Sequence, residues 1–347
     1  DKLIPDLFHK ARISNYAFVD SHSTILNPMW YTGVPDQYST LPGRFASFSE
    51  MTFRNRLKNF LNDALMKIVL NVALYDFTKK IEEKFDDPPN LYEQIANTSM
   101  VFMNRIPAIE FPSLTTHTTV DIGGLTITKT NKSLDEHWSS ILSLRPRTVL
   151  ISFGTIALSS DMPEGYKKSI FQTIQSFPDV TFVWKYEKPE DRISEGINNL
   201  IEAKFTPQRE ILQDSRLALF ITHCGLSSTL ETMMAGVPII AIPTISDQYR
   251  NALMFKRNGG GIVMDKEDLG NSMKMIEAVR EILYNPKHTS NARQVASRLS
   301  SSPISGKENF LRHFDFLVKF GPLHHLKHFG TTQSFIQYYS IDVIAII

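Results

Sequence analysis

Cysteine is nearly missing from this sequence, since Cys224 is the only one among 347 residues. A single cysteine cannot form a disulfide bond within the chain, and it is too few for a zinc site built from thiolates. A lone cysteine neither requires nor forbids an oxidising compartment, so it leaves the redox environment open. The composition therefore excludes a small domain held together by disulfides.

The sequence also has no excess of positive or negative charge. Lys and Arg total 37 against 36 for Asp and Glu, so the formal net charge at pH 7 is +1. This balance gives no signal for nucleic acid or for an anionic membrane surface as a partner. Hydrophobic residues make up 42% and charged residues 21%, which excludes a largely disordered chain.

The sequence also lacks a long apolar run. A membrane span needs about 20 apolar residues, whereas the last run, residues 343–347, has five. The first residues contain neither the basic nor the apolar part of a signal peptide. A soluble domain does not need an apolar end, so we expect a chain that is incomplete at both ends. The final run is then a buried tail or the first turn of a truncated span.

The length predicts two domains, at about 150 residues each. A polar stretch over residues 128–136 is the candidate linker. We therefore expect a partial first domain over residues 1–135 and a second domain over residues 136–320.

Short apolar runs alternate with helical patterns from residue 148 onward. The expected strands cover residues 148–153, 180–184, 217–221, 237–242 and 261–264. Apolar strands without alternation, separated by helices, predict a parallel sheet covered on both faces, as in a Rossmann-like α/β domain. In the first part, residues 16–19 and 100–103 indicate strands, and residues 48–84 indicate a long helix.

The segment over residues 220–248 contains the strongest functional signal. A strand ends at Thr222-His223, a glycine-containing turn follows, and a helix is expected to open at Ser227-Ser228. The unpaired N–H groups and the dipole at a helix start favour a phosphate or diphosphate, with side-chain donors added. Each residue alone also has a structural explanation: Ser227 as an N-cap, Asp247 as the cap of the next helix, and His223 as a structural histidine.

Several short motifs occur along the chain, each at a defined distance from the others. They are Thr222-His223-Cys224-Gly225, Glu231, Gly236-Val237-Pro238, Pro243 and Asp247-Gln248, with Ser152-Phe153-Gly154-Thr155 and Lys204-Phe205-Thr206-Pro207-Gln208 upstream and residues 337–344 downstream. This composite resembles the signature of the UDP-glycosyltransferases, inverting sugar transferases that include the animal glucuronosyltransferases. Weaker likeness extends the resemblance to nearly the whole chain.

The resemblance implies an α/β fold of the GT-B type, with two Rossmann-like domains facing a cleft and the N-terminal, acceptor-binding one incomplete. The C-terminal domain would bind the UDP-sugar. Residues 321–347 would be a return segment that leads into a truncated transmembrane helix. The full-length relatives imply a single-pass protein of the endoplasmic reticulum membrane with its catalytic domains in the lumen. The resemblance is compatible with a homo- or hetero-oligomer and does not choose between them. The sequons at Asn97 and Asn131 fit a lumenal chain.

The family's contacts with uridine and sugar transfer to five positions. Phe205, where relatives usually have Trp, would stack on the uracil. Gln208 would contact the uracil or the ribose, and Glu231 would accept hydrogen bonds from the ribose hydroxyls. Asp247 and Gln248 would bind the hydroxyls of the sugar.

The family's diphosphate contacts transfer to the two turns. Thr155, His223 and Ser228 would hydrogen-bond the diphosphate, assisted by the helix start. Gly225 lies in the same turn, and Ser227 stands where many relatives have Asn.

The implied reaction is direct displacement at the anomeric carbon of a UDP-sugar carrying glucuronic acid or glucose. A base takes the proton of a small lipophilic acceptor's hydroxyl, while the helix start and His223 stabilise the departing UDP. The family's base, a His, would lie before residue 1, and its acidic partner at or just before Asp1. His9 and His22 are not at that position, so the catalytic residues are unknown.

No metal or other cofactor is expected, because no Asp-x-Asp motif follows a strand. The trio His324, His325 and His328 is interpreted as solvated or structural. The alternative function is a non-catalytic form that binds a nucleotide or a partner and lacks the base. A nicotinamide dehydrogenase is disfavoured, because no G-x-G-x-x-G follows a strand.

Overall fold

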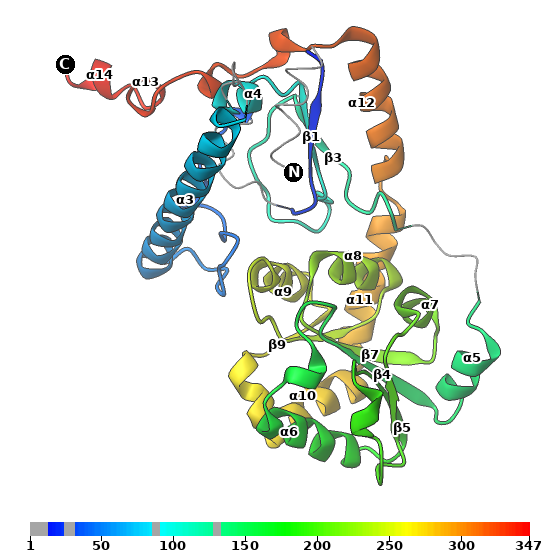
Figure 1. Ribbon diagram of the computed structural model, residues 1–347. Coiled ribbons are helices and arrows are strands. Elements are labelled where there is room, and N and C mark those ends of the chain that lie inside the picture. Colours follow the sequence, from blue (N-terminus) through cyan, green and yellow to red (C-terminus); the bar gives the residue numbers. More distant parts are fainter. Residues whose placement is uncertain (1–12, 24–31, 85–90, 128–132) are drawn as a thin grey trace. The chain divides into compact units, whose positions relative to one another are not determined.

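The computed structural model describes residues 13–23, 32–84, 91–127 and 133–347. The chain forms two compact units (Figure 1). Unit 1 comprises Asp1–Thr126 together with Ile304–Ile347, and unit 2 comprises Ile127–Pro303. All strand pairs of the described residues are parallel, so both units are of the α/β type.

Unit 2 is built on a six-stranded parallel sheet with the order β6-β5-β4-β7-β8-β9. The strands are β4 (Arg147–Ser152), β5 (Val180–Lys185), β6 (Leu200–Ala203), β7 (Leu217–Thr222), β8 (Ile239–Ala241) and β9 (Gly261–Val263). The central strands are apolar without alternation, and nearly all of their residues are buried. This confirms the predicted parallel sheet. The edge strand β6 was not predicted, and only its first residue is buried.

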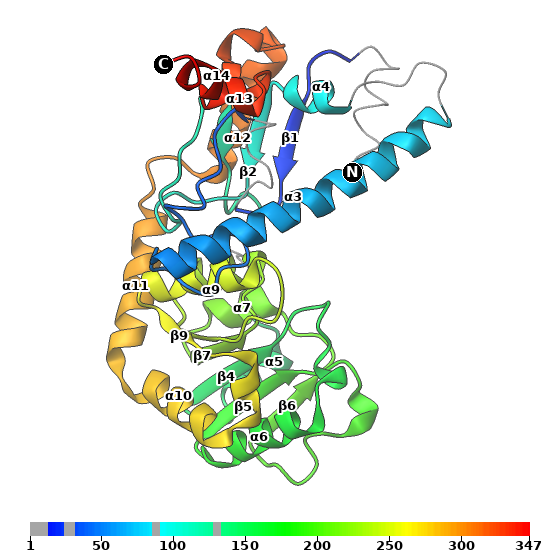
Figure 2. The same ribbon diagram turned by 90° about the vertical axis from the view of Figure 1, so that its left-hand side faces the viewer.

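Helices cover both faces of this sheet (Figures 1 and 2). The helices are α5 (Glu136–Leu142), α6 (Glu164–Gln175), α7 (Gln208–Gln213), α8 (Leu226–Ala235), α9 (Gln248–Arg257), α10 (Ser272–Tyr284) and α11 (Pro286–Ser300). One face packs against α6 and α10 in the main core, where Ile174 and Val279 meet Trp184 of β5 and Ile221 of β7. Helices α7, α8 and α9 lie on the other face (Figure 1).

Unit 1 contains a three-stranded parallel sheet with the order β1-β2-β3. Its elements are β1 (Ala17–Asp20), α3 (Phe53–Glu82), α4 (Leu91–Ala96), β2 (Met100–Met103), β3 (Thr119–Asp121), α12 (Gly306–Phe320), α13 (Phe335–Tyr338) and α14 (Ile341–Ile344). The predicted strands near residues 16–19 and 100–103 and the long helix within residues 48–84 are confirmed. No helix of the described residues has the length and apolarity that a membrane span requires.

Helix α12 belongs to unit 1, which corrects the expected end of the second domain from residue 320 to Pro303. Its Asn309 donates to the backbone oxygen of Asp121 at 2.8 Å, and its Phe310 ring lies 5.0 Å from that of Phe102. The helix therefore packs on the first sheet. The periodicity of an amphipathic helix gives its apolar face, but it does not say which sheet that face covers.

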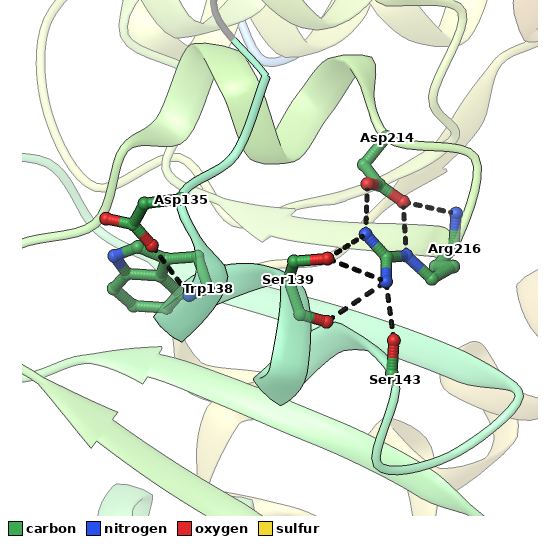
Figure 3. A network of polar contacts seen from close by, with 6 residues as sticks. All are labelled: Asp135, Trp138, Ser139, Ser143, Asp214 and Arg216. Carbon is green, nitrogen blue, oxygen red and sulfur yellow. Dashed lines mark hydrogen bonds and ion pairs between the residues drawn. The ribbon is translucent and has the colours of Figure 1, made fainter.

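A polar network ties α5 to the start of β7 (Figure 3). The Arg216 guanidinium binds both carboxylate oxygens of Asp214, with Nε 2.8 Å from Oδ1 and Nη2 2.6 Å from Oδ2. Its Nη1 donates to the backbone oxygen of Ser139 at 3.0 Å and to the Ser143 hydroxyl at 2.6 Å. The guanidinium holds the pKa of the Asp214 carboxyl below its usual range. Arg216 thus fixes the helix through which the chain enters unit 2.

We expect Arg216→Lys to lower the free energy of unfolding by about 1–2 kcal/mol at pH 7, because an ammonium cannot make the paired contacts of the guanidinium. The pKa of Asp214 is lowered by folding, so its contribution is present above about pH 4 and is lost as the pH falls further. Urea unfolding at pH 7 and pH 3 measures both effects. Arg293→Lys, at an exposed position of α11, is the control. An equal loss of unfolding free energy in Arg216→Lys and Arg293→Lys would contradict the role of the network.

Candidate functional site

The predicted site residues of unit 2 follow the carboxyl ends of its strands. The chain passes from β4 through β5 to β6 in one direction and then returns to β7 on the other side of β4. Ser152 and Thr222 pair at the ends of β4 and β7, so Gly154 and His223 begin neighbouring loops. Ligands of open α/β sheets bind beyond the carboxyl ends of the strands at such a reversal. The topology therefore places the candidate site at this edge.

The ring of His223 lies against two glycines. A Cβ on Gly154 would be 2.6 Å from His223 Cε1, and a Cβ on Gly225 would be 2.8 Å from His223 Nε2. Gly154 also has a φ of +88°, which L side chains rarely adopt. The imidazole can occupy this position only because both loops lack a side chain there.

The surroundings of His223 keep its ring neutral. Burial lowers its pKa to about 4, and Lys185 acts in the same direction while Asp247 opposes it. The backbone of Ser152 also opposes the shift, and the buried Nδ1 has no hydrogen-bond partner of good geometry among the described residues. A neutral imidazole offers one N–H donor and one acceptor nitrogen at pH 7. The ring is thus suited to donate a hydrogen bond to an anionic ligand without carrying a full charge.

The turn after β7 is braced by Asn251 of α9. The Asn251 amide donates at 3.0 Å both to the backbone oxygen of Cys224 and to Oδ2 of Asp247. Cys224 adopts a φ of +64°. Burial raises the pKa of its thiol to about 12, which excludes a nucleophilic role at neutral pH. Asn251 therefore links the turn that carries His223 to the loop that carries Asp247.

Both N-cap explanations fail in the structure. Helix α8 begins at Leu226 with Gly225 as its N-cap and without a capping side chain, so Ser227 lies inside the first turn and is exposed. Asp247 stands at the N-cap position of α9, but its side chain does not cap that helix. The N–H groups at the start of α8 thus receive no capping side chain, which favours an anion there.

Three of the predicted residues contact one another where α7 and α8 meet. The Gln208 amide donates to Glu231 Oε2 at 2.7 Å and to the Ser228 hydroxyl at 3.1 Å. Arg209 donates from Nε to Glu231 Oε1 at 2.9 Å. The Glu231 carboxylate is therefore held as an acceptor by two donors from α7.

Phe205 lies on the loop between β6 and α7, and 76% of the residue is exposed. The ring is therefore not packed in the core of unit 2. Removing a large aromatic ring from water is favourable, so this exposed ring, three residues before Gln208, offers a flat surface for stacking.

Gln248 is buried, and its carbonyl oxygen is used within the protein. Oε1 accepts from the backbone N–H groups of Thr244 and Ile245 at 2.8 and 3.0 Å, and from the Thr244 hydroxyl at 2.8 Å. The side chain therefore shapes the loop after β8. Thr155 is exposed after β4.

Lys185 is a site residue that the sequence analysis missed. It ends β5, and its Nζ donates to the backbone oxygen of Gly154 at 2.5 Å and to Glu187 Oε1 at 3.2 Å. It therefore brings a cation to the loop that follows β4. In the sequence, Lys185 is a single lysine at the end of an apolar strand. That pattern does not identify the groups that the ammonium contacts.

The described part of the chain contains no group of three His, Cys, Asp or Glu side chains that could hold a metal ion. In the histidine trio, His328 accepts from the backbone N–H of Gly330 at 2.9 Å. Asp1, His9 and Asn131 lie outside the described residues.

Comparisons with known proteins show which family the chain belongs to. The family model described as UDP-glucoronosyl and UDP-glucosyl transferase matches residues 4–347. The chain is similar to the putative UDP-glucuronosyltransferases ugt-48 and ugt-47 of Caenorhabditis elegans, with 30% and 29% identity. Each match covers 90% of this chain and 60% of the relative, so the chain spans about 60% of the length of these curated relatives.

Two solved structures share the fold. The glycotransferase of kitacinnamycin aligns with a TM-score of 0.57 and 16% identity, over 77% of this chain and 66% of that one. UDP-glucose: anthocyanidin 3-O-glucosyltransferase in complex with UDP aligns with a TM-score of 0.53 and 16% identity, over 66% and 57%. Both matches support the predicted GT-B fold class.

We expect Gly154→Ala to destabilise the chain by about 1–3 kcal/mol, because the new methyl would overlap the His223 ring in a left-handed backbone. Displacement of the ring should also raise the pKa of His223 from about 4 toward its ordinary value. Thermal unfolding and NMR titration of the ring measure these changes. Gly165→Ala is the matched control, because a Cβ there meets nothing within 4 Å and should leave the His223 pKa unchanged. A tolerated Gly154→Ala with an unchanged pKa would contradict the close fit.

The lowered pKa of His223 predicts a pH dependence of stability. Between about pH 6.5 and 4 the unfolded chain binds a proton at this residue and the folded chain does not, so stability falls across that window. We expect the free energy of unfolding to fall by about 2–3 kcal/mol less between pH 6.5 and 4 in His223→Gln than in the wild type. Urea unfolding at several pH values measures it, with His137→Gln, in the exposed first turn of α5, as control. Parallel pH curves for wild type and His223→Gln would contradict the pKa shift.

Proposed function

Because the chain belongs to the UDP-glucoronosyl and UDP-glucosyl transferase family, we propose that it transfers a hexosyl group from a UDP-sugar to the hydroxyl of a small lipophilic acceptor. The hexosyl group is glucuronic acid or glucose. The observation that carries the proposal is the gathering of the predicted donor-binding residues at one sheet edge of unit 2. They come from the loops after β4, β6, β7 and β8 and from the helices that follow.

The uridine part of the donor is assigned to the region around α7. Phe205 presents an exposed ring on which a uracil can stack, and base–aromatic stacking is worth about 1–3 kcal/mol. Each oxygen of the Glu231 carboxylate has a second lone pair beyond its contact with Gln208 or Arg209. Glu231 can therefore accept from ribose hydroxyls while it keeps its protein contacts.

The diphosphate is assigned to the turns after β4 and β7. The uncapped N–H groups of α8, the neutral His223 ring and the hydroxyls of Thr155, Ser227 and Ser228 supply donors. Lys185 adds a positive charge at the loop after β4. These groups can stabilise the charge that gathers on UDP as it leaves, which is how a preorganised site lowers a barrier.

The sugar is assigned to the loop after β8. The Asp247 carboxylate can accept from sugar hydroxyls, and the amide nitrogen of Gln248 can donate, because its oxygen is already bound to the loop. The reaction we propose inverts the anomeric carbon by direct displacement. The bond from that carbon to the diphosphate oxygen breaks as the bond to the acceptor oxygen forms. No cofactor enters this proposal, since the donor groups above supply the leaving-group stabilisation.

The cellular setting is also a proposal. The family resemblance favours the endoplasmic reticulum membrane, with the catalytic units in the lumen and a single membrane span. The side chains of Val343, Ile344, Ile346 and Ile347 are exposed, and Asn97 of the first sequon is half-buried.

We expect the chain to bind UDP, and Phe205→Ala to weaken this binding by about 1–3 kcal/mol without changing the melting temperature. Phe205→Trp should preserve or tighten binding, because the larger ring stacks with more area. Titration calorimetry measures the affinity. Met273→Ala is the control, because Met273 is an exposed apolar residue of α10 in the same unit.

Absence of UDP binding in the wild-type chain would contradict the proposed donor site. An unchanged affinity in Phe205→Ala would remove the stacking role alone. Transfer is measured separately, with UDP-glucuronic acid and UDP-glucose as donors and 4-methylumbelliferone, a phenol, as acceptor.

A further inference from the structure

One buried amide group of unit 2 joins two loops of the candidate donor site. Asn251, in the first turn of α9, is 1% exposed. Its Nδ2 lies 3.0 Å from the backbone oxygen of Cys224, in the turn after β7, and 3.0 Å from Oδ2 of Asp247, at the end of the loop after β8. An amide nitrogen carries two protons, which matches the two acceptors that it bridges.

The chemistry of the two acceptors fixes the direction of the Asn251 amide group. A backbone oxygen and a carboxylate only accept, so the nitrogen side of the amide must face both of them. Asp and Leu have nearly the same shape as Asn, but neither a carboxylate nor an isobutyl group can donate. The bridge therefore requires the hydrogen-bond donors of Asn251 and not only its volume.

Other contacts hold each of the two loops by itself. The side-chain oxygen of Gln248 accepts from two backbone N–H groups of the loop after β8, at 2.8 and 3.0 Å. The turn after β7 follows the parallel pairing of β7 with β8, and the backbone N–H of Cys224 donates to the Thr222 hydroxyl at 3.3 Å. Among the described residues, the hydrogen bond from Asn251 is the one that ties the Asp247 carboxylate to that turn.

The Asp247 carboxylate keeps acceptor sites for a ligand. It is half-buried and does not cap α9. A carboxylate offers about four lone-pair sites, and Asn251 uses one of them on Oδ2. Burial lowers the pKa of the His223 ring, and the negative charge of Asp247 acts against this shift, so the two side chains interact. The same amide group thus holds the carboxylate directly and the His223 turn through Cys224.

We propose that Asn251 is a positioning residue of the donor site, which holds the Asp247 carboxylate at a fixed place relative to the His223 turn. The ligand class is a nucleoside diphosphate sugar, whose sugar hydroxyls meet Asp247 and whose diphosphate meets the turn. A carboxylate that is fixed before the ligand arrives loses little freedom on binding. The inference rests on the proposed function, from which it takes the nature of the donor.

The test compares the affinities of the full chain for UDP and for UDP-glucose by titration calorimetry, with UDP-glucuronic acid as the second donor. We expect Asn251→Leu to weaken binding of both UDP-sugars by about 3–10-fold, because a hydrogen bond to the sugar is lost. Binding of UDP should weaken by about twofold or less, because UDP has no sugar for Asp247 to bind. Asn251→Asp should weaken UDP-sugar binding at least as much, since it places a second negative charge beside Asp247.

Asn199 of the same unit supplies the matched control. It is buried before β6, and its amide donates to three backbone oxygens at 2.8, 3.0 and 3.2 Å. Asn199→Leu therefore removes a buried amide that has only backbone partners. It should lower the melting temperature and leave the ratio of the UDP-glucose and UDP affinities as it is in the wild type.

A double-mutant cycle separates positioning from damage to the fold. We expect Asp247→Ala to weaken UDP-glucose binding by about 3–10-fold in the wild-type background. In the Asn251→Leu background the same change should have an effect of less than about twofold, because the carboxylate is no longer held in place. A purely structural role of Asn251 would lower the melting temperature and leave the two effects additive.

The outcomes distinguish this inference from the proposed function. Equal losses of UDP and UDP-glucose affinity in Asn251→Leu, or additive effects in the cycle, overturn the positioning role and leave the donor site intact. Asn251→Ala, which adds no bulk, replaces Asn251→Leu where the latter does not fold, and failure of both to fold overturns the positioning role. Absence of UDP binding in the wild type contradicts the donor site itself, and the positioning role with it.

Discussion

The parallel pairing of β4 with β7 is the constraint on which the candidate site depends. Parallel strands need long crossover connections, so the chain between them must form helices, and these cover both faces of the sheet. The carboxyl ends of parallel strands then lie at one edge. The register that pairs Ser152 with Thr222 brings the loops of Gly154 and His223 together, although they are far apart in sequence.

Small backbone features complete the site. The His223 ring fits only because Gly154 and Gly225 have no side chains, and Asn251 holds the turn at Cys224. Burial then lowers the pKa of His223, so the neutral ring can donate to an anion without the cost of a buried charge. The local chemistry of the site therefore follows from packing as much as from the identity of its polar residues.

Three exposed apolar side chains of unit 2 follow strands at the same edge. Ile156, Phe205 and Ile245 follow β4, β6 and β8, and all three are exposed. A folded domain buries large apolar side chains where it can, so a group of them around polar, hydrogen-bonding residues is typical of a ligand site. This combination suits a ligand with a flat base at one end and charged and hydroxyl groups at the other.

The sequence alone determined five of the six strands of the second sheet, because uninterrupted apolar runs such as residues 148–153 are typical of strands that a parallel sheet buries on both faces. Motif spacing also identified the family, and it predicts donor-site positions from Thr155 to Gln248. The tertiary structure decided what lies side by side. It assigned α12 to unit 1, excluded a capping role for Ser227, and brought Lys185 and Asn251 to the site. Sequence periodicity reports which face of an element is apolar, whereas these contacts depend on strand order and loop geometry, which join residues distant along the chain.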